Sequence, residues 1–207
     1  MERRHPRQKG VEMIRAEIGD VGFAHGDGWL QRAIRWAERA PGESRSWANH
    51  SLLFTRAGIV GPAPVEDQAW AVEALGRVEH NPWFDRHRKE AGYRVQVFRP
   101  LFMEWRDAGI VVANALEHKG DKYGWWKLGA FLGDRFFFKG LPFLAKLLFL
   151  DNRPICSYLV GSAFEEAGYP HAFGPVPARA QDPDTQHDYV TSGTGRWSYV
   201  GEVQVPA

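Results

Sequence analysis

Three short extended segments between residues 50 and 99 constrain the fold most. HSLLFTR, AWAVEALGRV and YRVQVFR have the length and the apolar or alternating pattern that are typical of β-strands. The turn-rich stretch AGIVGPAPVEDQ separates the first two segments, so we expect them to be neighbouring antiparallel strands. Near the end of the chain, RWSYVGEVQV predicts a closing strand.

Amphipathic patterns predict helices on either side of these strands. Apolar residues recur at helical spacing over 28–39, 102–118 and 156–167, and Gly168 is well placed to end the third helix. The proline-punctuated stretch 169–190 is predicted to be a loop. Helices and a small antiparallel sheet in one unit predict an α+β domain, with the sheet packed against the helices.

Length and charge limit the organisation and the partners. We expect one domain over 18–207, preceded by a polar, flexible arm over 1–17 that leads into a short strand. The net charge of +1, from 26 basic and 25 acidic residues, gives no general attraction to nucleic acid. The basic run DRHRKE ends in acids on both sides and is expected to be solvated. The absence of a signal-peptide core in the first residues and the single cysteine predict a cytoplasmic protein.

Residues 125–150 are rich in Phe and Leu but are interrupted by charges and by Pro142. A membrane span needs roughly 20 consecutive apolar residues, so this stretch is not a convincing span. We expect a pair of core helices around a Gly-Leu-Pro turn. The alternative is an apolar cover beside an active site, in which residues 131–150 contact lipid as a peripheral membrane surface.

The only cysteine, Cys156, is predicted to lie in the first turn of a helix. Unpaired amides and the aligned peptide dipoles of a helix N-terminus stabilise a thiolate and can also stabilise an oxyanion. The alternative for a single intracellular cysteine is inert packing.

A thiolate nucleophile needs a base and a group that orients the base. His50 opens a predicted strand, so its direction would be fixed, and Glu73 is a carboxylate in an otherwise apolar neighbouring strand. We expect the two to pair, although a structural histidine and a solvated strand-edge carboxylate are the alternatives. The remaining histidines, apart from His25, lie in polar contexts that favour solvated side chains: His5, His80, His87, His118, His171 and His187. A metal site at His25 and Asp27 is disfavoured, because HGDG is common in turns and no His-x-x-x-His pair occurs.

Several short motifs come in an order that resembles one protein family. They are Gly19-Asp20, His50 in SWANHSLLF, Glu73 in AVEALGRV, Tyr123 in GDKYGWW and Cys156-Ser157 in ICSYLVGSAF. These elements resemble the NlpC-type papain-like cysteine peptidases and amidases, in the order of the circularly permuted, YiiX-like branch. That branch is related to proteins resembling lecithin:retinol acyltransferase. VFRP and DPDTQHDYV extend the resemblance along the chain.

The resemblance implies a role for each matching residue. Cys156 would be the nucleophile, His50 the general base and Glu73 the group that orients the imidazole, while Tyr123 would lie near the nucleophile and help hold the oxyanion or serve as a half-buried aromatic. It implies a hydrolase or acyltransferase that acts on an amide or ester bond of a small-molecule, peptide or lipid-linked substrate through a thioester. No cofactor, metal or nucleic acid is expected. The alternative is a lipid or small-ligand binding protein on the same fold.

Overall fold

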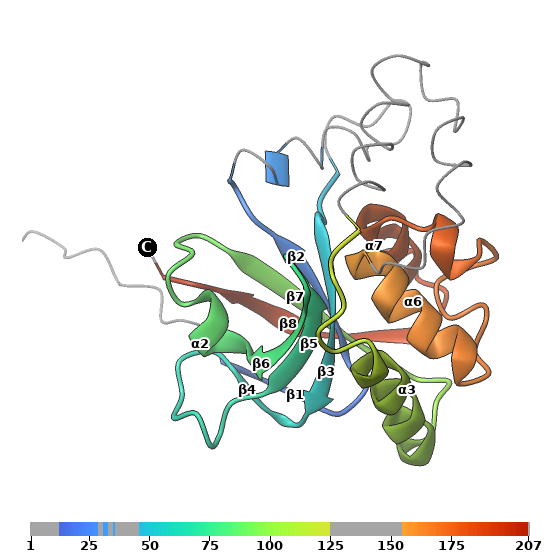
Figure 1. Cartoon of the computed structure of the whole chain (residues 1–207), viewed down its shortest axis with the longest axis horizontal. Coiled ribbons are helices and arrows are strands. Elements are labelled where there is room, and N and C mark those ends of the chain that lie inside the picture. Colours follow the sequence, from blue (N-terminus) through green and yellow to red (C-terminus); the bar gives the residue numbers. More distant parts are fainter. Residues whose placement is uncertain (1–12, 29–30, 33–34, 36–45, 125–154, 207) are drawn as a thin grey trace, which may run out of the picture.

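The computed structural model describes residues 13–28, 31, 32, 35, 46–124 and 155–206, and these residues form an α+β fold. A six-stranded sheet, antiparallel throughout, has the order β6-β5-β3-β2-β7-β8 (Figure 1). Its strands are β2 (Val21–His25), β3 (His50–Arg56), β5 (Trp70–Ala74), β6 (Val78–Pro82), β7 (Arg94–Pro100) and β8 (Trp197–Gln204). The predicted fold class is therefore confirmed at the level of an antiparallel sheet with helices.

The helices cover the two faces of the sheet unequally. In Figure 1, α3 (Trp105–Glu117), α6 (Cys156–Glu166) and α7 (Pro183–Thr191) lie on one side, and the short α2 (Trp83–His87) lies on the other. A small second sheet pairs β1 (Ile14–Ala16) with β4 (Gly58–Val60). A 3-10 helix, η2 (Ala178–Ala180), precedes α7.

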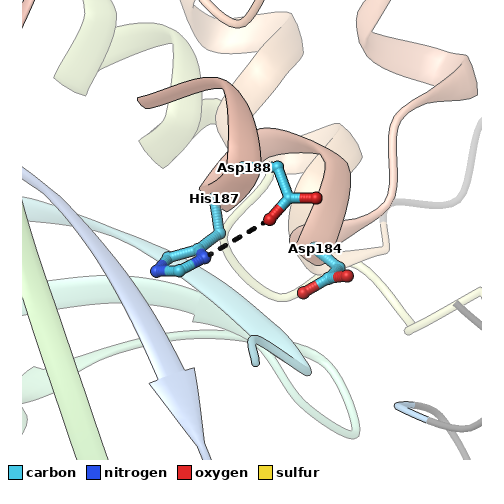
Figure 2. Close-up of side chains that lie close together, drawn as sticks. All are labelled: Asp184, His187 and Asp188. Carbon is cyan, nitrogen blue, oxygen red and sulfur yellow. Dashed lines mark ion pairs between the residues drawn. The ribbon is translucent and has the colours of Figure 1, made fainter. Parts of the chain in front are cut away.

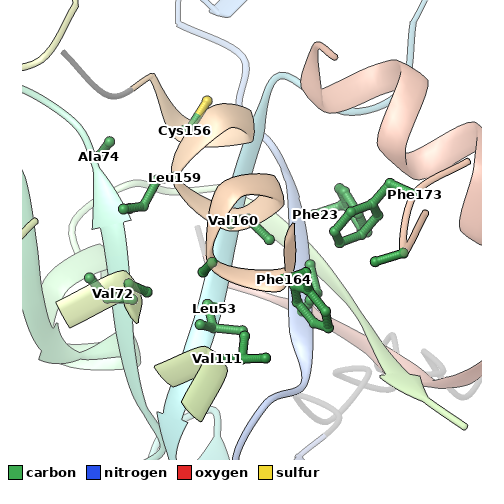
Figure 3. Packing of buried hydrophobic residues seen from close by; sticks show 14 of the residues in the cluster. Phe23, Leu53, Val72, Ala74, Val111, Cys156, Leu159, Val160, Phe164 and Phe173 are labelled. Carbon is green, nitrogen blue, oxygen red and sulfur yellow. The ribbon is translucent and has the colours of Figure 1, made fainter. Parts of the chain in front are cut away.

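Strand alternation divides the core into two layers. Leu53, Val72 and Phe23 point toward the helices and pack with Leu159 and Phe164 of α6 (Figure 3). The residues between them on the strands, including Leu52 and Phe54, point to the opposite face and pack with Trp83 of α2. Both faces of the sheet are thus buried, and His50 and Glu73 belong to the face opposite the helical layer.

The ends of α6 agree closely with the predicted helix over 156–167. Ile155 is extended at the N-cap, so Cys156 is the first helical residue. At the other end, Gly168 has a φ of +92°, a conformation that costs a residue with a Cβ more than it costs glycine. The single cysteine is therefore in the first turn, as predicted.

Several predicted boundaries were wrong for local reasons. The segment AWAVEALGRV forms two strands, because the chain reverses after β5 and Leu75 N donates to Arg77 O (3.1 Å). Helix α7 begins within the stretch 169–190, which was predicted to be a loop. Residues 14–16, within the predicted arm, form β1, because they pair with β4 and bury Ala16.

Two predictions fall on residues that the structure does not describe. The pair of core helices predicted within 125–150 lies outside the described residues, with the alternative of a lipid-contacting surface over 131–150, and so does most of the predicted helix over 28–39. Of that range, Gly28 is described and forms a bend, and Gln31, Arg32 and Arg35 are described and helical. Among the described residues, no helix has both the length and the apolar character required to cross a bilayer.

Candidate active site

Cys156 lies where the first turn of α6 meets the N-terminal end of β3. Its sulfur lies at the beginning of the helix in Figure 3, and only 4% of the residue is exposed. The backbone amides of Ser51 and Ser157 are near this sulfur and help to lower the pKa of the thiol. The thiol therefore contacts both the strand that carries His50 and its own helix N-terminus.

A bridge of polar side chains fixes α6 against β3. Ser51 Oγ donates to Gln186 Oε1 (3.0 Å), and Gln186 Nε2 donates to the carbonyl oxygen of Ser157 (2.9 Å). Ser157 Oγ in turn donates to the carbonyl oxygen of Gln181 (2.8 Å). Because these side chains are buried, the bridge sets the position of the first turn of α6 next to His50.

The register of the sheet brings His50 and Glu73 together. Leu52 in β3 lies opposite Glu73 in β5, and His50 is two residues from Leu52 on the same face of β3. The distance from His50 Nε2 to Glu73 Oε2 is 3.0 Å. Since Glu73 is 1% exposed, it is a buried, paired carboxylate, as the sequence predicted, and not a solvated strand-edge charge.

The charges of these three groups support one another. Burial opposes ionisation of Cys156, but the charge and hydrogen bond of His50, with the amides of Ser51 and Ser157, outweigh it and lower the pKa of the thiol. Burial also opposes the charge on His50, yet Cys156 and Glu73 raise the pKa of its imidazole to about 10. This arrangement favours a thiolate and an imidazolium side by side.

A second histidine contacts the same carboxylate. His87 Nε2 lies 3.0 Å from Glu73 Oε1 and 3.2 Å from Oε2, and His87 is 1% exposed. Despite its own burial, the contacts with Glu73 and Glu90 raise the pKa of His87 to about 9. Burial disfavours a charged Glu73, but His87 and His50 together hold the pKa of that carboxyl well below its usual range.

The prediction that His87 and His187 are solvated was wrong. Each follows a polar sequence, but α2 carries His87 into the apolar layer formed with Trp83, and α7 carries His187 onto the ring of Trp47, with centroids 4.7 Å apart. Polar neighbours in the sequence do not mark an exposed helix face here, because Asp184 and Gln186 beside His187 are buried as well. No periodicity in the sequence distinguishes such a position from a surface one.

Tyr123, the fourth predicted site residue, lies in the same apolar cluster as Cys156. It is 8% exposed, and its backbone amide donates to Gly76 O (3.2 Å). The structure thus gathers Cys156, His50 and Glu73 in a row and places Tyr123 in the adjoining core.

Two motifs that lie outside this row have a structural role. Asp20 is buried and receives two hydrogen bonds from the guanidinium of Arg99, at 2.9 and 2.8 Å from Nε and Nη2. The Gly19-Asp20 and VFRP motifs therefore contact each other across β2 and β7. Because His50 pairs with Ala24 near the other end of β2, this ion pair is remote from Cys156.

An arginine occupies the place where a metal at His25 and Asp27 would bind. Arg35 Nη1 lies 2.7 Å from His25 Nε2, and its Nη2 lies 3.0 Å from Asp27 Oδ1. A guanidinium and a metal cation cannot both use these ligand atoms. These contacts agree with the expectation that His25 and Asp27 do not form a metal site.

A different cluster, on α7, offers three potential metal ligands. Ligand atoms of Asp184, His187 and Asp188 lie within 4.8 Å of one another (Figure 2). Asp184 Oδ1 accepts the backbone amides of Trp47 (2.8 Å) and Ala48 (3.2 Å), and so joins α7 to the segment that precedes β3. Among the described residues, His187 Nδ1 is buried and has no hydrogen-bond partner.

Comparisons with known proteins support the fold alone. No family model matches the sequence, and no curated protein matches it. The structure is similar to the crystal structure of the metalloprotein YiiX from Escherichia coli O157:H7, with a TM-score of 0.55 and 13% sequence identity, over 91% of this chain and 98% of that chain. The chain therefore has an α+β fold that resembles YiiX over nearly its whole length.

Proposed function

We propose that this chain is a cysteine-dependent hydrolase or acyltransferase with a circularly permuted, papain-like fold of the NlpC type. The observation that carries the proposal is the buried row Cys156, His50 and Glu73, in which a thiol, an imidazole and a carboxylate come from α6, β3 and β5. A nucleophile, a base and an orienting group in contact are the arrangement that covalent acyl transfer requires. The likeness of the fold to YiiX is consistent with this proposal.

The reaction follows from the charges of the row. The Cys156 thiolate attacks the carbonyl carbon of an amide or ester, so that a carbon–sulfur bond forms and the carbonyl electrons move to oxygen. Amides at the first turn of α6 stabilise that oxyanion. His50 then gives its proton to the leaving nitrogen or oxygen, the bond to the leaving group breaks, and a thioester remains.

The second half of the cycle uses the same imidazole as a base. Neutral His50 accepts a proton from water or from another acceptor, whose oxygen or nitrogen attacks the thioester carbon. The Cys156 thiolate leaves, and the product acid, ester or amide is released. Water gives a hydrolase, and a different acceptor gives an acyltransferase. Glu73 keeps the ring of His50 oriented in both halves.

An electrophilic probe tests this proposal. The protein is treated with iodoacetamide at neutral pH, and labelling is measured by mass spectrometry for the wild type, Cys156→Ala and His50→Ala. We expect fast labelling of the wild type, none of Cys156→Ala and slow labelling of His50→Ala. Equal labelling rates in the wild type and His50→Ala would remove His50 from the mechanism, and slow labelling of both would favour the non-catalytic binding protein.

Metal binding on α7 is a second candidate function. Burial lowers the pKa of His187 to about 4, so its imidazole is neutral near neutral pH, and its Nε2 already lies 2.9 Å from Gln96 Oε1. The other nitrogen, Nδ1, can therefore offer a lone pair beside the carboxylates of Asp184 and Asp188, a donor set that Zn²⁺ accepts. YiiX, the similar structure, is described as a metalloprotein. The bound cation would stabilise the position of α7.

Calorimetric titration of the chelator-treated protein with Zn²⁺ tests this second function. We expect one bound ion per chain in the wild type and none in His187→Ala. His171→Ala is the control, because His171 is exposed and outside the cluster. Unchanged binding in His187→Ala, or no binding in the wild type, contradicts a site on α7.

A further inference from the structure

We propose that His87 is a positioning residue of this site, whose imidazolium keeps the buried Glu73 carboxylate ionised and aligned on His50. The inference rests on the proposed function, because it concerns how the row of Cys156, His50 and Glu73 is kept active. It adds a second imidazole and a second carboxylate, Glu90, to that row. The five side chains then alternate in charge from the thiolate to the protein surface.

The contacts of His87 suit a positioning role. Its Nε2 is within 3.2 Å of both oxygens of Glu73, so it fixes the plane of the carboxylate as well as its place. His50 contacts the Oε2 side at 3.0 Å. With one imidazole on each side, the carboxylate has little freedom to rotate away from His50.

The ring of His87 is itself held in one orientation. It stacks on the ring of Tyr93, with centroids 4.5 Å apart and planes at 5°, and lies 5.4 Å from the ring of Trp83. Its Nδ1 lies 3.2 Å from Glu90 Oε1. Both ring nitrogens therefore face carboxylates, and only the doubly protonated imidazolium can donate to both.

A buried carboxylate needs this second positive charge. Removing Glu73 from water favours its neutral form, and a neutral Glu73 cannot stabilise a charged His50. In that case the imidazolium of His50 no longer favours the thiolate of Cys156. The charge of His87 therefore acts on the thiol indirectly, through Glu73 and His50.

The groups that face His87 come from three elements. Glu73 lies in β5 and Arg86 lies in α2. Glu90 follows α2, and Tyr93 directly precedes β7. Arg86 Nη1 lies 3.8 Å from Glu90 Oε1, so its positive charge partly offsets the attraction between Glu90 and His87. Glu73 is consequently the main partner of His87, and Glu90 is the weaker, half-exposed one.

The test is the pH profile of thiol alkylation. The second-order rate constant of iodoacetamide with Cys156 is measured from pH 4 to pH 10 in the wild type, His87→Gln and Glu90→Gln. His118→Gln is the matched control, because His118 Nδ1 also lies 3.0 Å from a carboxylate, Asp121, but in an exposed pair remote from the thiol. Glutamine at position 87 can still donate a hydrogen bond to Glu73 but has no charge.

We expect the acid side of the profile, where the rate rises with pH, to move up by about 0.5 to 1 pH unit in His87→Gln, which lowers the rate about threefold to tenfold at pH values below that rise. Glu90→Gln should move it in the same direction by less, and His118→Gln should not move it. If His87→Gln does not fold, the Glu90→Gln profile decides the question alone. Restoration of the profile by a small imidazole added to His87→Ala further supports the proposal.

Two results would overturn the inference. One is an alkylation profile of His87→Gln that is the same as that of the wild type while the thermal midpoint of the variant is lower. His87 would then only stabilise the fold. The other is a shift toward lower pH. Failure of the proposed function looks different, because the wild-type thiol itself would then react as an ordinary thiol with a pKa of roughly 8.5.

Discussion

His50 and Glu73 contact each other across two adjacent antiparallel strands, with His50 Nε2 3.0 Å from Glu73 Oε2. Both side chains are almost completely buried, and His87 approaches the same carboxylate. Glu73 is thus the anion between two imidazoles. Its charge is the feature on which the stability of this region depends.

Replacing Glu73 by Gln should therefore be costly. Two buried imidazoles would face a neutral amide, and the loss of one partner from a buried ion pair typically costs about 3–5 kcal/mol. We expect the free energy of unfolding in urea at pH 7 to fall by that amount. Glu79→Gln is the control: Glu79 lies opposite Glu73 in β6, but its pair with Arg86 is about one-third exposed, so the change should be below about 1 kcal/mol. Similar losses in the two variants would contradict this account.

His87 should make the protein less stable as the pH rises above neutrality. Its pKa is about 9 in the folded protein against an unperturbed 6.5, so the native state binds more protons than the unfolded state between these values. The contribution is complete below about pH 6.5 and is lost as the pH rises through 9, with a slope of at most about 1.4 kcal/mol per pH unit.

Cys156 and His50 add little to this slope only near pH 7.5, midway between their unperturbed pKa values of roughly 6.5 and 8.5. There the folded thiolate–imidazolium pair and the unfolded pair each hold about one proton. At other pH values the pair contributes to the slope in both of the proteins compared. Urea unfolding at several values between pH 6 and pH 9 measures the slope, and its difference between the wild type and His87→Gln isolates His87. Parallel curves for the two proteins would show that His87 is not charged in the folded state.

The Asp20–Arg99 pair should affect stability without affecting the thiol. Asp20 is buried and accepts two charged hydrogen bonds from Arg99, so Asp20→Asn should lower the free energy of unfolding by about 1–3 kcal/mol. Because the pair lies at the far end of β2 from His50, the alkylation rate of Cys156 should stay within about twofold of the wild type. A large drop in that rate, in protein that remains folded, would mean that the two ends of the sheet are coupled.

The N-cap of α7 offers a local test of the helix that the sequence did not predict. Asp182 accepts a hydrogen bond from Thr185 N (2.6 Å), and Pro183 follows at the first helical position. Asp182→Ala should cost about 1 kcal/mol in urea unfolding, whereas Asp182→Asn, which keeps an acceptor, should cost only a few tenths. Equal effects of the two substitutions would show that the cap does not stabilise α7.

The sequence predicted the parts of the fold that depend on local patterns. The strand of His50 and the helix of Cys156 have clear apolar periodicities and clear ends, so their bounds agree closely with the structure. The pairing of His50 with Glu73 could be expected because the two segments were predicted to be adjacent strands. In each case the pattern lies within a few residues of the chain.

The parts that were missed depend on tertiary contacts. α7 contains polar residues and follows several prolines, yet Asp182-Pro183 is a helix-start signal, and Gln186 is buried because it bridges α6 and β3. His87 gave no signal, because its burial depends on Trp83 and Tyr93 and its charge depends on Glu73. These contacts join segments whose proximity no local pattern encodes.

The order of the elements has a consequence for synthesis on the ribosome. Five of the six strands of the main sheet, with His50 and Glu73, emerge before α6. Until α6 follows, Phe23, Leu53 and Val72 lack the helix that packs on them, so we expect a chain truncated before α6 to expose this apolar surface and to be prone to aggregation. Because Cys156 is the first residue of that same helix, the thiol reaches the end of β3 only together with the helix that covers this apolar layer.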